Sequence, residues 1–162
     1  MASRTRGVDG PSRALAGLYF SPEFLIRRAH QIATAVFTGT CADLDLTPSQ
    51  YAALFALRER SPIGQNELGR LIALDRSTTS VVVKILRDRG LVTASSDASD
   101  RRKAFLDLTN EGRLLLAKAE RRNSQSSQEL LSVFDKKQAS VFLELLDKLA
   151  NSLGAKAGPG TR

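Results

Sequence analysis

The sequence has few of the residues that most often carry chemistry. Its 162 residues include one cysteine, one histidine and no tryptophan. A single cysteine excludes an internal disulfide and is typical of a chain that folds in the reducing cytoplasm. Neither a glycine-rich phosphate loop nor an H-E-x-x-H spacing occurs, so nothing indicates a nucleotide cofactor or a metal site. We therefore expect no cofactor, no metal and no enzyme.

Long hydrophobic runs are also missing. No apolar stretch approaches the ~20 residues that a membrane-spanning helix needs. The first residues, MASRTRGVDGPSRALAG, contain no apolar core followed by a cleavage site, so they do not form a signal peptide. With 42% hydrophobic and 25% charged residues, the composition is that of a globular protein with a buried core. We expect a cytoplasmic protein with no membrane partner.

The net charge of +7 is spread unevenly along the chain. Residues 1–13 hold three arginines and one aspartate, and residues 154–162 hold one lysine and one arginine. Residues 48–110 hold ten basic and seven acidic side chains. Basic proteins often bind nucleic acid, but charged tails also serve solubility. The positions of the central charges therefore matter more than their sum.

The order of predicted elements is two helices, a helix-turn-helix, a β-hairpin and two more helices. Ser21 with Pro22 begins the first helix, and a capping box of Thr47 and Gln50 begins the second. Short helices at 65–73 and 76–89 are joined only by Leu74 and Asp75, the spacing of a helix-turn-helix. Strand-like runs at 91–93 and 105–108 then enclose a polar tip. Further helices follow at about 110–131 and after a capping box of Asp135 and Gln138.

The helix at 76–89 contains the β-branched run Thr-Thr-Ser-Val-Val-Val, which has poor helix propensity. Asp75 is a good N-cap and Gly90 a usual stop, so the segment is still predicted to be helical. The second helix of a helix-turn-helix enters the DNA major groove with its N-terminal residues at base edges and phosphates. Val82, Ile85 and Leu86 are expected to form the inner face. The predicted DNA-binding residues of this helix are Arg76, Ser77, Thr78, Thr79, Ser80, Lys84 and Arg87.

The hairpin tip is strongly charged. It carries Arg101, Arg102 and Lys103, and arginines on a projecting hairpin fit the narrow minor groove of A·T-rich DNA. Asp97 and Asp100 are expected to orient these side chains. Either feature alone is also explained by a solvated turn, but the hydroxyl-rich helix and the basic tip together favour DNA binding.

Three stretches resemble the MarR family of winged-helix transcriptional regulators: LTPSQYAALFAL, ELGRLIALDRSTTSVVVKILRDRGLV and DRRKAFLDLTNEG. The resemblance covers about residues 20–150. Ser99 departs from the hairpin signature D-x-R-D-x-R…L-x-L-T-x-x-G, since many members have Arg there, and Arg101 is a possible replacement. The positions that match the signature are Asp97, Asp100, Arg102, Leu108, Thr109 and Gly112.

The resemblance implies a mainly α fold with a small β-wing, and a dimer formed by the N- and C-terminal helices. Such dimers bind pseudo-palindromic DNA and commonly release it when a small phenolic or aromatic acid binds. The stretch FLIRRAHQI is similar to members that control aromatic-acid catabolism, nicotinate-type repressors among them. We expect a helical dimerisation region at 18–46 and 110–153, a DNA-binding lobe at 47–109, and mobile tails at 1–17 and 154–162.

An aromatic carboxylate needs apolar walls and one or two polar groups. Arg28 offers a bidentate fork to a carboxylate, and His30 can bond a ring hydroxyl or nitrogen; both lie at the edges of the apolar arc of the first helix. Tyr19, Phe24 and Tyr51 are further candidates for the ligand site. The plainer alternatives are a salt bridge for Arg28, a half-buried histidine for His30 and core positions for the aromatic residues.

Two alternative functions stay open. A thiol-based redox sensor would use Cys41, but reactivity needs nearby positive charge, and Asp43 and Asp45 follow it. A buried, inert Cys41 is therefore favoured. A winged-helix adaptor that binds proteins would not need basic and hydroxyl residues on both helix and hairpin.

The last predicted helix has one strongly apolar side. A contiguous apolar side of this size marks an interface if a lone chain leaves it exposed, so we expect it to form a homodimer. The predicted dimer residues are Val141, Phe142, Leu145, Leu149 and Leu153.

Overall fold

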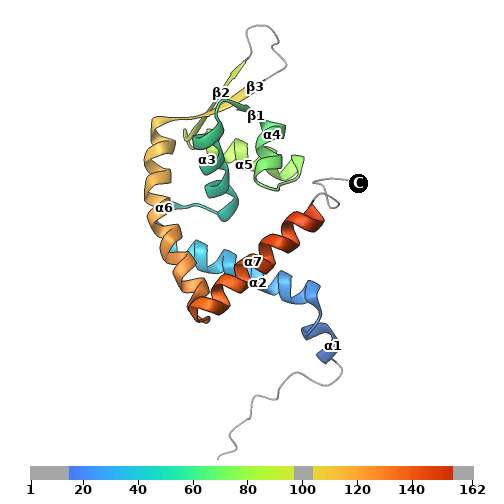
Figure 1. Ribbon diagram of the computed structural model, residues 1–162. Coiled ribbons are helices and arrows are strands. Elements are labelled where there is room, and N and C mark those ends of the chain that lie inside the picture. The colour runs from blue at the N-terminus through green and yellow to red at the C-terminus, as the bar shows by residue number, and fades with distance from the viewer. Residues whose placement is uncertain (1–14, 97–103, 155–162) are drawn as a thin grey trace, which may run out of the picture. The chain divides into compact units, whose positions relative to one another are not determined.

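The computed structural model describes residues 15–96 and 104–154. The chain divides into two compact units, residues 1–35 and residues 36–162. In the described residues, no helix combines the length and the apolar character that crossing a membrane requires. Helices make up most of the described residues in both units, and a small sheet lies in the second (Figure 1).

The first unit contains α1 (Ala16–Tyr19) and most of α2 (Pro22–Thr40). The Ser21 hydroxyl accepts the backbone N–H of Phe24 at 3.4 Å, which confirms the predicted start of α2. The short α1 was not predicted, because it is a single turn without an amphipathic period. The predicted tail at 1–17 therefore extends too far: its end is helical, and residues 1–14 lie outside the described part.

The second unit begins with the last turn of α2 and the single-turn helix η2, and it continues through a winged arrangement of helices and strands. Its predicted elements are confirmed, with ends that differ by a few residues. The Thr47–Gln50 and Asp135–Gln138 capping boxes form as expected. The elements are η2 (Ala42–Leu44), α3 (Pro48–Arg60), β1 (Ile63–Gly64), α4 (Gln65–Leu71), α5 (Arg76–Asp88), β2 (Val92–Ser96), β3 (Ala104–Leu108), α6 (Asn110–Leu131) and α7 (Lys136–Gly154).

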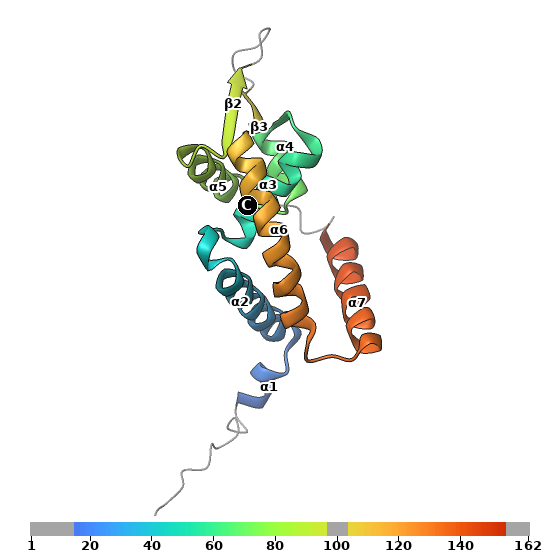
Figure 2. The same ribbon diagram turned by 90° about the vertical axis from the view of Figure 1, so that its left-hand side faces the viewer.

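The sheet has three antiparallel strands in the order β1-β3-β2. Its outer strand β1 was not predicted, because Ser61-Pro62-Ile63-Gly64 looks like a simple chain break. Ile63 instead pairs with Leu106 and is buried in the core. Where β1 ends, β2 and β3 continue as a pair of strands that extends past α3, α4 and α5 (Figures 1 and 2).

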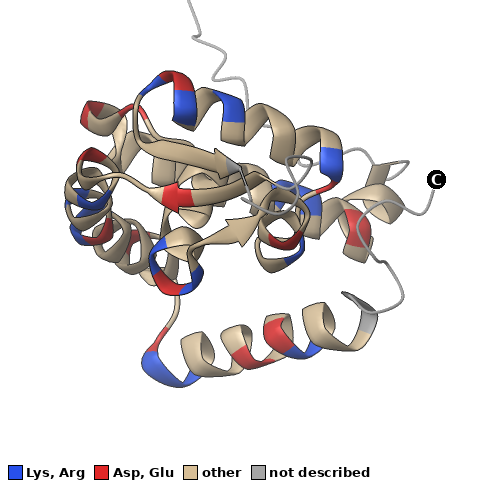
Figure 3. Ribbon diagram, turned by 90° about the horizontal axis from the view of Figure 1, so that it is seen from above, with Lys and Arg blue, Asp and Glu red and all other residues tan. Residues whose placement is uncertain are grey.

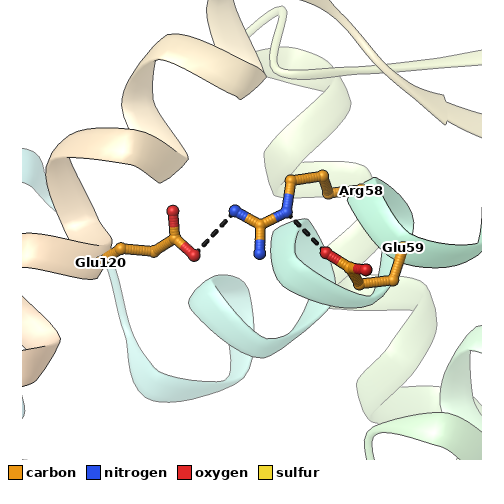
Figure 4. Close-up of polar contacts among 3 residues, drawn as sticks. All are labelled: Arg58, Glu59 and Glu120. Carbon is orange, nitrogen blue, oxygen red and sulfur yellow. Dashed lines mark hydrogen bonds and ion pairs between the residues drawn. The ribbon is translucent and has the colours of Figure 1, made fainter.

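The core of the second unit lies between α3, α4, α5, the sheet and α6. Leu54, Leu57, Leu68, Leu86 and Leu116 are each fully buried there. At its edge the Arg58 guanidinium donates to Glu120 of α6 at 2.7 Å and to the adjacent Glu59 at 2.8 Å (Figure 4). The same guanidinium lies 4.6 Å from the centre of the Phe55 ring. Arg58 therefore ties α3 to α6 beside the hydrophobic contacts.

Gly112 lies at a close approach between the first turn of α6 and the backbone that follows α5. A Cβ atom at this position would lie 2.2 Å from the Leu91 carbonyl oxygen and 2.8 Å from the Leu108 side chain. Both distances are shorter than van der Waals contact, and the nearer atom belongs to the backbone. Only glycine fits here without moving the first turn of α6.

Gly112→Ala is expected to lower the free energy of unfolding by about 1–3 kcal/mol, the usual cost of overpacking, as measured by urea denaturation at fixed protein concentration. Gly39→Ala is the matched control, because Gly39 is helical and nothing lies within 4 Å of an added Cβ. The control should gain up to ~1 kcal/mol of helix propensity. Equal stability of the Gly112→Ala and wild-type proteins would contradict the close approach.

Candidate nucleic-acid interface

The N-terminus of α5 is held by one carboxylate. Asp75 accepts the backbone N–H of Thr78 at 2.9 Å, the Thr78 hydroxyl at 2.6 Å and the Ser77 hydroxyl at 2.5 Å. The Ser77 and Thr78 hydroxyls hold the pKa of Asp75 well below its ordinary value. Asp75 is therefore ionised and fixed as the N-cap, and the predicted start of α5 is confirmed.

The inner side of α5 differs from the prediction at one position. Its buried residues are Thr79, Val82, Val83 and Leu86. Ile85 was expected to face the core but is 38% exposed, whereas Val83 is 3% exposed. Val83 lies four residues after Thr79 and three before Leu86, so these residues share the side of α5 that packs against the core.

Thr79 is not available for a base contact. Its side chain is 1% exposed, and its hydroxyl donates to the Asp75 carbonyl at 2.7 Å. It packs against Gly69 of α4 so closely that a Cβ on Gly69 would lie 2.6 Å from the Thr79 hydroxyl oxygen. The prediction that Thr79 belongs to the DNA-binding set is wrong, because this residue joins the two helices of the helix-turn-helix.

The outer side of α5 carries the remaining predicted residues. Arg76, Ser77, Thr78, Ser80, Lys84 and Arg87 are all exposed. Lys84 forms an ion pair with Asp88 at 2.6 Å one turn later, so its charge is partly balanced on the helix itself. Val81 is also exposed on this side, at 58%. The sequence analysis did not identify Val81 as a surface residue. Its spacing indicates the exposed side, because it lies four residues after Ser77 and three before Lys84.

The C-terminus of α5 is fixed to two other parts of the second unit. The Arg89 guanidinium donates to the carbonyls of Leu44, at 3.0 Å, and of Asp45, next to η2. Gly90 ends the helix with a φ of +70°, as predicted for a glycine stop. The Thr109 hydroxyl donates to the Gly90 carbonyl at 2.8 Å and accepts the backbone N–H of Gly112 at 3.0 Å. One threonine thus caps α6 and holds the end of α5.

The base of the hairpin is ordered by polar contacts of Asp107. Its carboxylate accepts the Ser61 hydroxyl at 2.6 Å and lies 3.7 Å from Arg113. The Ser61 hydrogen bond is the main cause of a lowered pKa of Asp107. The predicted tip residues Asp97, Asp100, Arg101, Arg102 and Lys103 lie outside the described residues.

The helices of the described part carry charges of both signs (Figure 3). Some of these charges form surface ion pairs, for example Arg122 with Asp43 at 2.9 Å. An interface on α5 therefore depends on which side chains are placed together, and not on a uniformly basic surface.

The predicted sensor residues fall in different surroundings. Arg28 and His30 are exposed on α2. Tyr19 packs edge-to-face on Phe24 with the ring centres 5.2 Å apart, so these two aromatic residues do lie together. Tyr51 belongs to the second unit, where it packs against Phe37 and Phe55, and burial is the main cause of its raised pKa. Tyr51 therefore contributes to the aromatic packing of α3.

Cys41 is 1% exposed. Burial is the largest cause of its raised pKa and outweighs the opposing hydrogen bond with Thr40, while the carboxylate of Asp43 raises the pKa further and Arg122 lowers it slightly. A raised pKa keeps the thiol protonated and slows its reaction with oxidants. This geometry favours the buried, inert cysteine over the redox sensor.

The apolar side of α7 is exposed in the single chain. Val141, Leu145 and Leu149 are 45%, 58% and 40% exposed. Phe142 is half-buried and stacks on Phe134, with the ring centres 5.0 Å apart. Leu153 lies in α7, and its side chain is outside the described part. The exposed residues among the predicted dimer set thus form an uncovered side of α7.

Thr79→Val is expected to lower the free energy of unfolding by about 1 kcal/mol, because it leaves the volume nearly unchanged but removes a buried hydrogen bond. The preference among DNA sequences should not change, since the side chain does not reach the surface. Thr38→Val is the matched control, because Thr38 is an exposed threonine of helix α2, and it should leave the stability in urea denaturation nearly unchanged. A changed base preference in the Thr79→Val protein would contradict the buried position.

Comparison with known proteins identifies the family. The sequence profile of the MarR family matches residues 44–103. The HTH-type transcriptional repressor NicR of Pseudomonas putida is 41% identical over 92 residues, which cover 57% of this chain and 58% of NicR. The chain thus spans less than two thirds of NicR. The transcriptional regulator HosA of Escherichia coli is 31% identical over 108 residues, which cover 67% of this chain and 80% of HosA.

The fold of this chain matches a solved structure along nearly the whole length of the solved protein. It is that of Bordetella bronchiseptica BpsR, from work on regulation of its DNA binding by 6-hydroxynicotinic acid, with a TM-score of 0.77 and 29% identity. The match covers 87% of this chain and 98% of BpsR. From the profile match, the identity to HosA over most of its length and the shared fold, we conclude that the chain belongs to the MarR family.

Proposed function

We propose that this protein is a dimeric, sequence-specific DNA-binding transcriptional repressor that a small aromatic acid releases from its operator. The observation that carries the proposal is the division of α5 into a buried side and an exposed side that bears Arg76, Ser77 and Ser80. The names of NicR as a repressor and of BpsR as a DNA-binding protein regulated by 6-hydroxynicotinic acid support it. A protein with this role acts in the cytoplasm.

DNA binding is proposed to use α5 in the major groove. The exposed Arg76 guanidinium favours a phosphate near the start of α5. The short side chains of Ser77 and Ser80 allow the helix backbone to approach the base edges. Arg101, Arg102 and Lys103 at the hairpin tip are proposed to contact the minor groove, with Asp97 and Asp100 orienting them.

A dimer is proposed because α7 exposes a row of apolar side chains. Val141, Leu145 and Leu149 recur at spacings of four residues, so they share one side of the helix. A second copy of the chain would remove this side from water. A two-fold dimer carries two copies of α5 and binds two half-sites related by the same symmetry.

Purified protein is expected to select duplex DNA with two inverted half-sites about one helical turn, ~10 base pairs, apart. Arg76→Ala should weaken binding to all duplexes by a similar factor and lower the slope of log affinity against log salt by about 1, the sign of a lost phosphate contact. Fluorescence anisotropy across a salt series measures both effects, and hydroxyl-radical footprinting measures the symmetry.

Arg121→Ala is the matched control, because Arg121 is an exposed arginine on α6. It should keep the wild-type salt slope. Equal slopes for the Arg76→Ala and wild-type proteins would remove Arg76 from the interface. A footprint without two-fold symmetry would contradict the dimeric arrangement.

The effector is proposed to be an aromatic carboxylate that binds against the first helix. Arg28 supplies a guanidinium whose fork matches a carboxylate, and it lies exposed and ready to pair. His30 supplies a second polar group, and the Tyr19–Phe24 pair supplies aromatic surface. These groups offer a planar acid a cation for its carboxylate and an aromatic surface for its ring.

Calorimetry with benzoate, hydroxybenzoates and 6-hydroxynicotinate is expected to show binding of at least one acid to the wild type and at least tenfold weaker binding to Arg28→Ala. Arg60→Ala, which changes an exposed arginine on α3, should bind like the wild type.

An effector that lowers operator affinity ~100-fold requires about 2.7 kcal/mol of coupling, and DNA must weaken effector binding by the same factor. Undiminished binding to Arg28→Ala would exclude this site, whereas release by peroxide that is lost in Cys41→Ser would favour the thiol switch.

A further inference from the structure

Two apolar, β-branched side chains are exposed on α5. Val81 is 58% exposed and Ile85 is 38% exposed, and they lie one helical turn apart. The other valines of the helix, Val82 and Val83, are 6% and 3% exposed. Single exposed apolar side chains are common on protein surfaces, so the groups that surround these two decide what they can contact.

Val81 occupies the centre of the exposed side. With 3.6 residues per turn, Ser77, Val81, Lys84 and Asp88 form one line along the helix. This line points away from the side that Thr79, Val83 and Leu86 bury in the core. Val81 also lies in the first half of α5, five residues after its first residue, Arg76. A groove that receives the N-terminal half of α5 therefore meets Val81 directly.

The surroundings of Val81 restrict what can cover it. Ser77, Ser80 and Lys84 border it, and Arg76 and Arg87 lie at the two ends of the same exposed side. Two isolated apolar side chains are too small a patch for a protein partner, whose interfaces bury far larger surfaces. Hydroxyls and cations around a small apolar centre instead complement the DNA major groove, where thymine presents a C5-methyl group between polar base edges and phosphates.

We propose that Val81 contacts the C5-methyl group of a thymine in each operator half-site, and that this contact selects the thymine at that position. Ile85, one turn later, extends the apolar surface towards the neighbouring base. The proposal rests on the DNA-binding function proposed above and adds a specificity-determining residue to it. It assigns base selection to an apolar contact within the mainly polar exposed side of α5.

The size of the effect follows from the area of one methyl group. Removing a methyl from a buried contact weakens binding about fourfold, which corresponds to ~0.8 kcal/mol. Replacing thymine by uracil in the operator removes this methyl and leaves the hydrogen-bonding edge of the base unchanged. The substitution therefore isolates the proposed contact from every polar contact in the interface.

The experiment uses the full-length protein and the duplex that it selects from a random library. Each thymine in one half-site is replaced in turn by deoxyuridine, and affinities are measured for the wild type, Val81→Ala and Val81→Thr. At one or two thymines the wild type should lose affinity about fourfold, whereas Val81→Ala should show no further loss from uracil. Val81→Thr retains one methyl and the β-branched shape, so its loss should lie between these two.

Val133→Ala is the matched control, because Val133 is 78% exposed in the α6–α7 connection. It should respond to uracil as the wild type does. Circular dichroism and sedimentation verify that all variants are folded and share one oligomeric state. Equal uracil effects in the wild type and Val81→Ala at all thymines would overturn the inference while leaving sequence-specific binding intact. A wild type that selects no duplex would overturn the proposed function, and this inference with it.

Discussion

The position of α5 depends on one tight contact, between Thr79 and Gly69. The Thr79 hydroxyl is bound to the Asp75 carbonyl at 2.7 Å, and a Cβ on Gly69 would lie 2.6 Å from the oxygen of that hydroxyl. The turn between the helices passes through Ala73 at a φ of +54° and closes with the hydrogen bond from Leu74 to the Gly69 carbonyl at 2.9 Å. A larger residue at Gly69 would push α4 away from α5 and change the angle between them. The surface that α5 presents is thus decided by a residue that is itself buried.

Burial and capping explain why α5 remains a helix in spite of its poor helix propensity. The β-branched residues of α5 are costly in an isolated helix, but Val82 and Val83 are buried and gain more from packing than they lose in side-chain freedom. Asp75 adds a charged cap that binds Ser77 and Thr78. Because burial and capping already stabilise α5, the residues at its exposed positions do not need a high helix propensity. Those positions carry serine, valine and lysine, residues suited to a contact with a groove.

The predictable features were those with a strong local signal. Capping residues marked the starts of α3, α5 and α7, and Gly90 marked the end of α5, because each acts through neighbours in the sequence. The β-branched run was harder: helical period alone did not decide between Val83 and Ile85, since the difference depends on where α3 and the sheet lie. Thr79 was placed on the wrong side for the same reason, and β1 has only two residues whose pairing with β3 is set by tertiary structure. Thr79 shows the difficulty, because a threonine has a polar group and a small volume and therefore suits both a groove contact and a buried contact between helices.

Both ends of α5 are fixed, and this constrains how an effector can act under the proposed function. Asp75 holds the first turn, while Arg89 binds the carbonyls of Leu44 and Asp45 and Thr109 binds that of Gly90. Bending or unwinding α5 would break these contacts and expose Leu86 and Val83. About 2.7 kcal/mol of coupling, enough for ~100-fold release, is small compared with the loss of several such interactions together. An effector of ordinary strength is therefore expected to change the separation of two intact lobes in a dimer, so that the two copies of α5 no longer match successive major grooves.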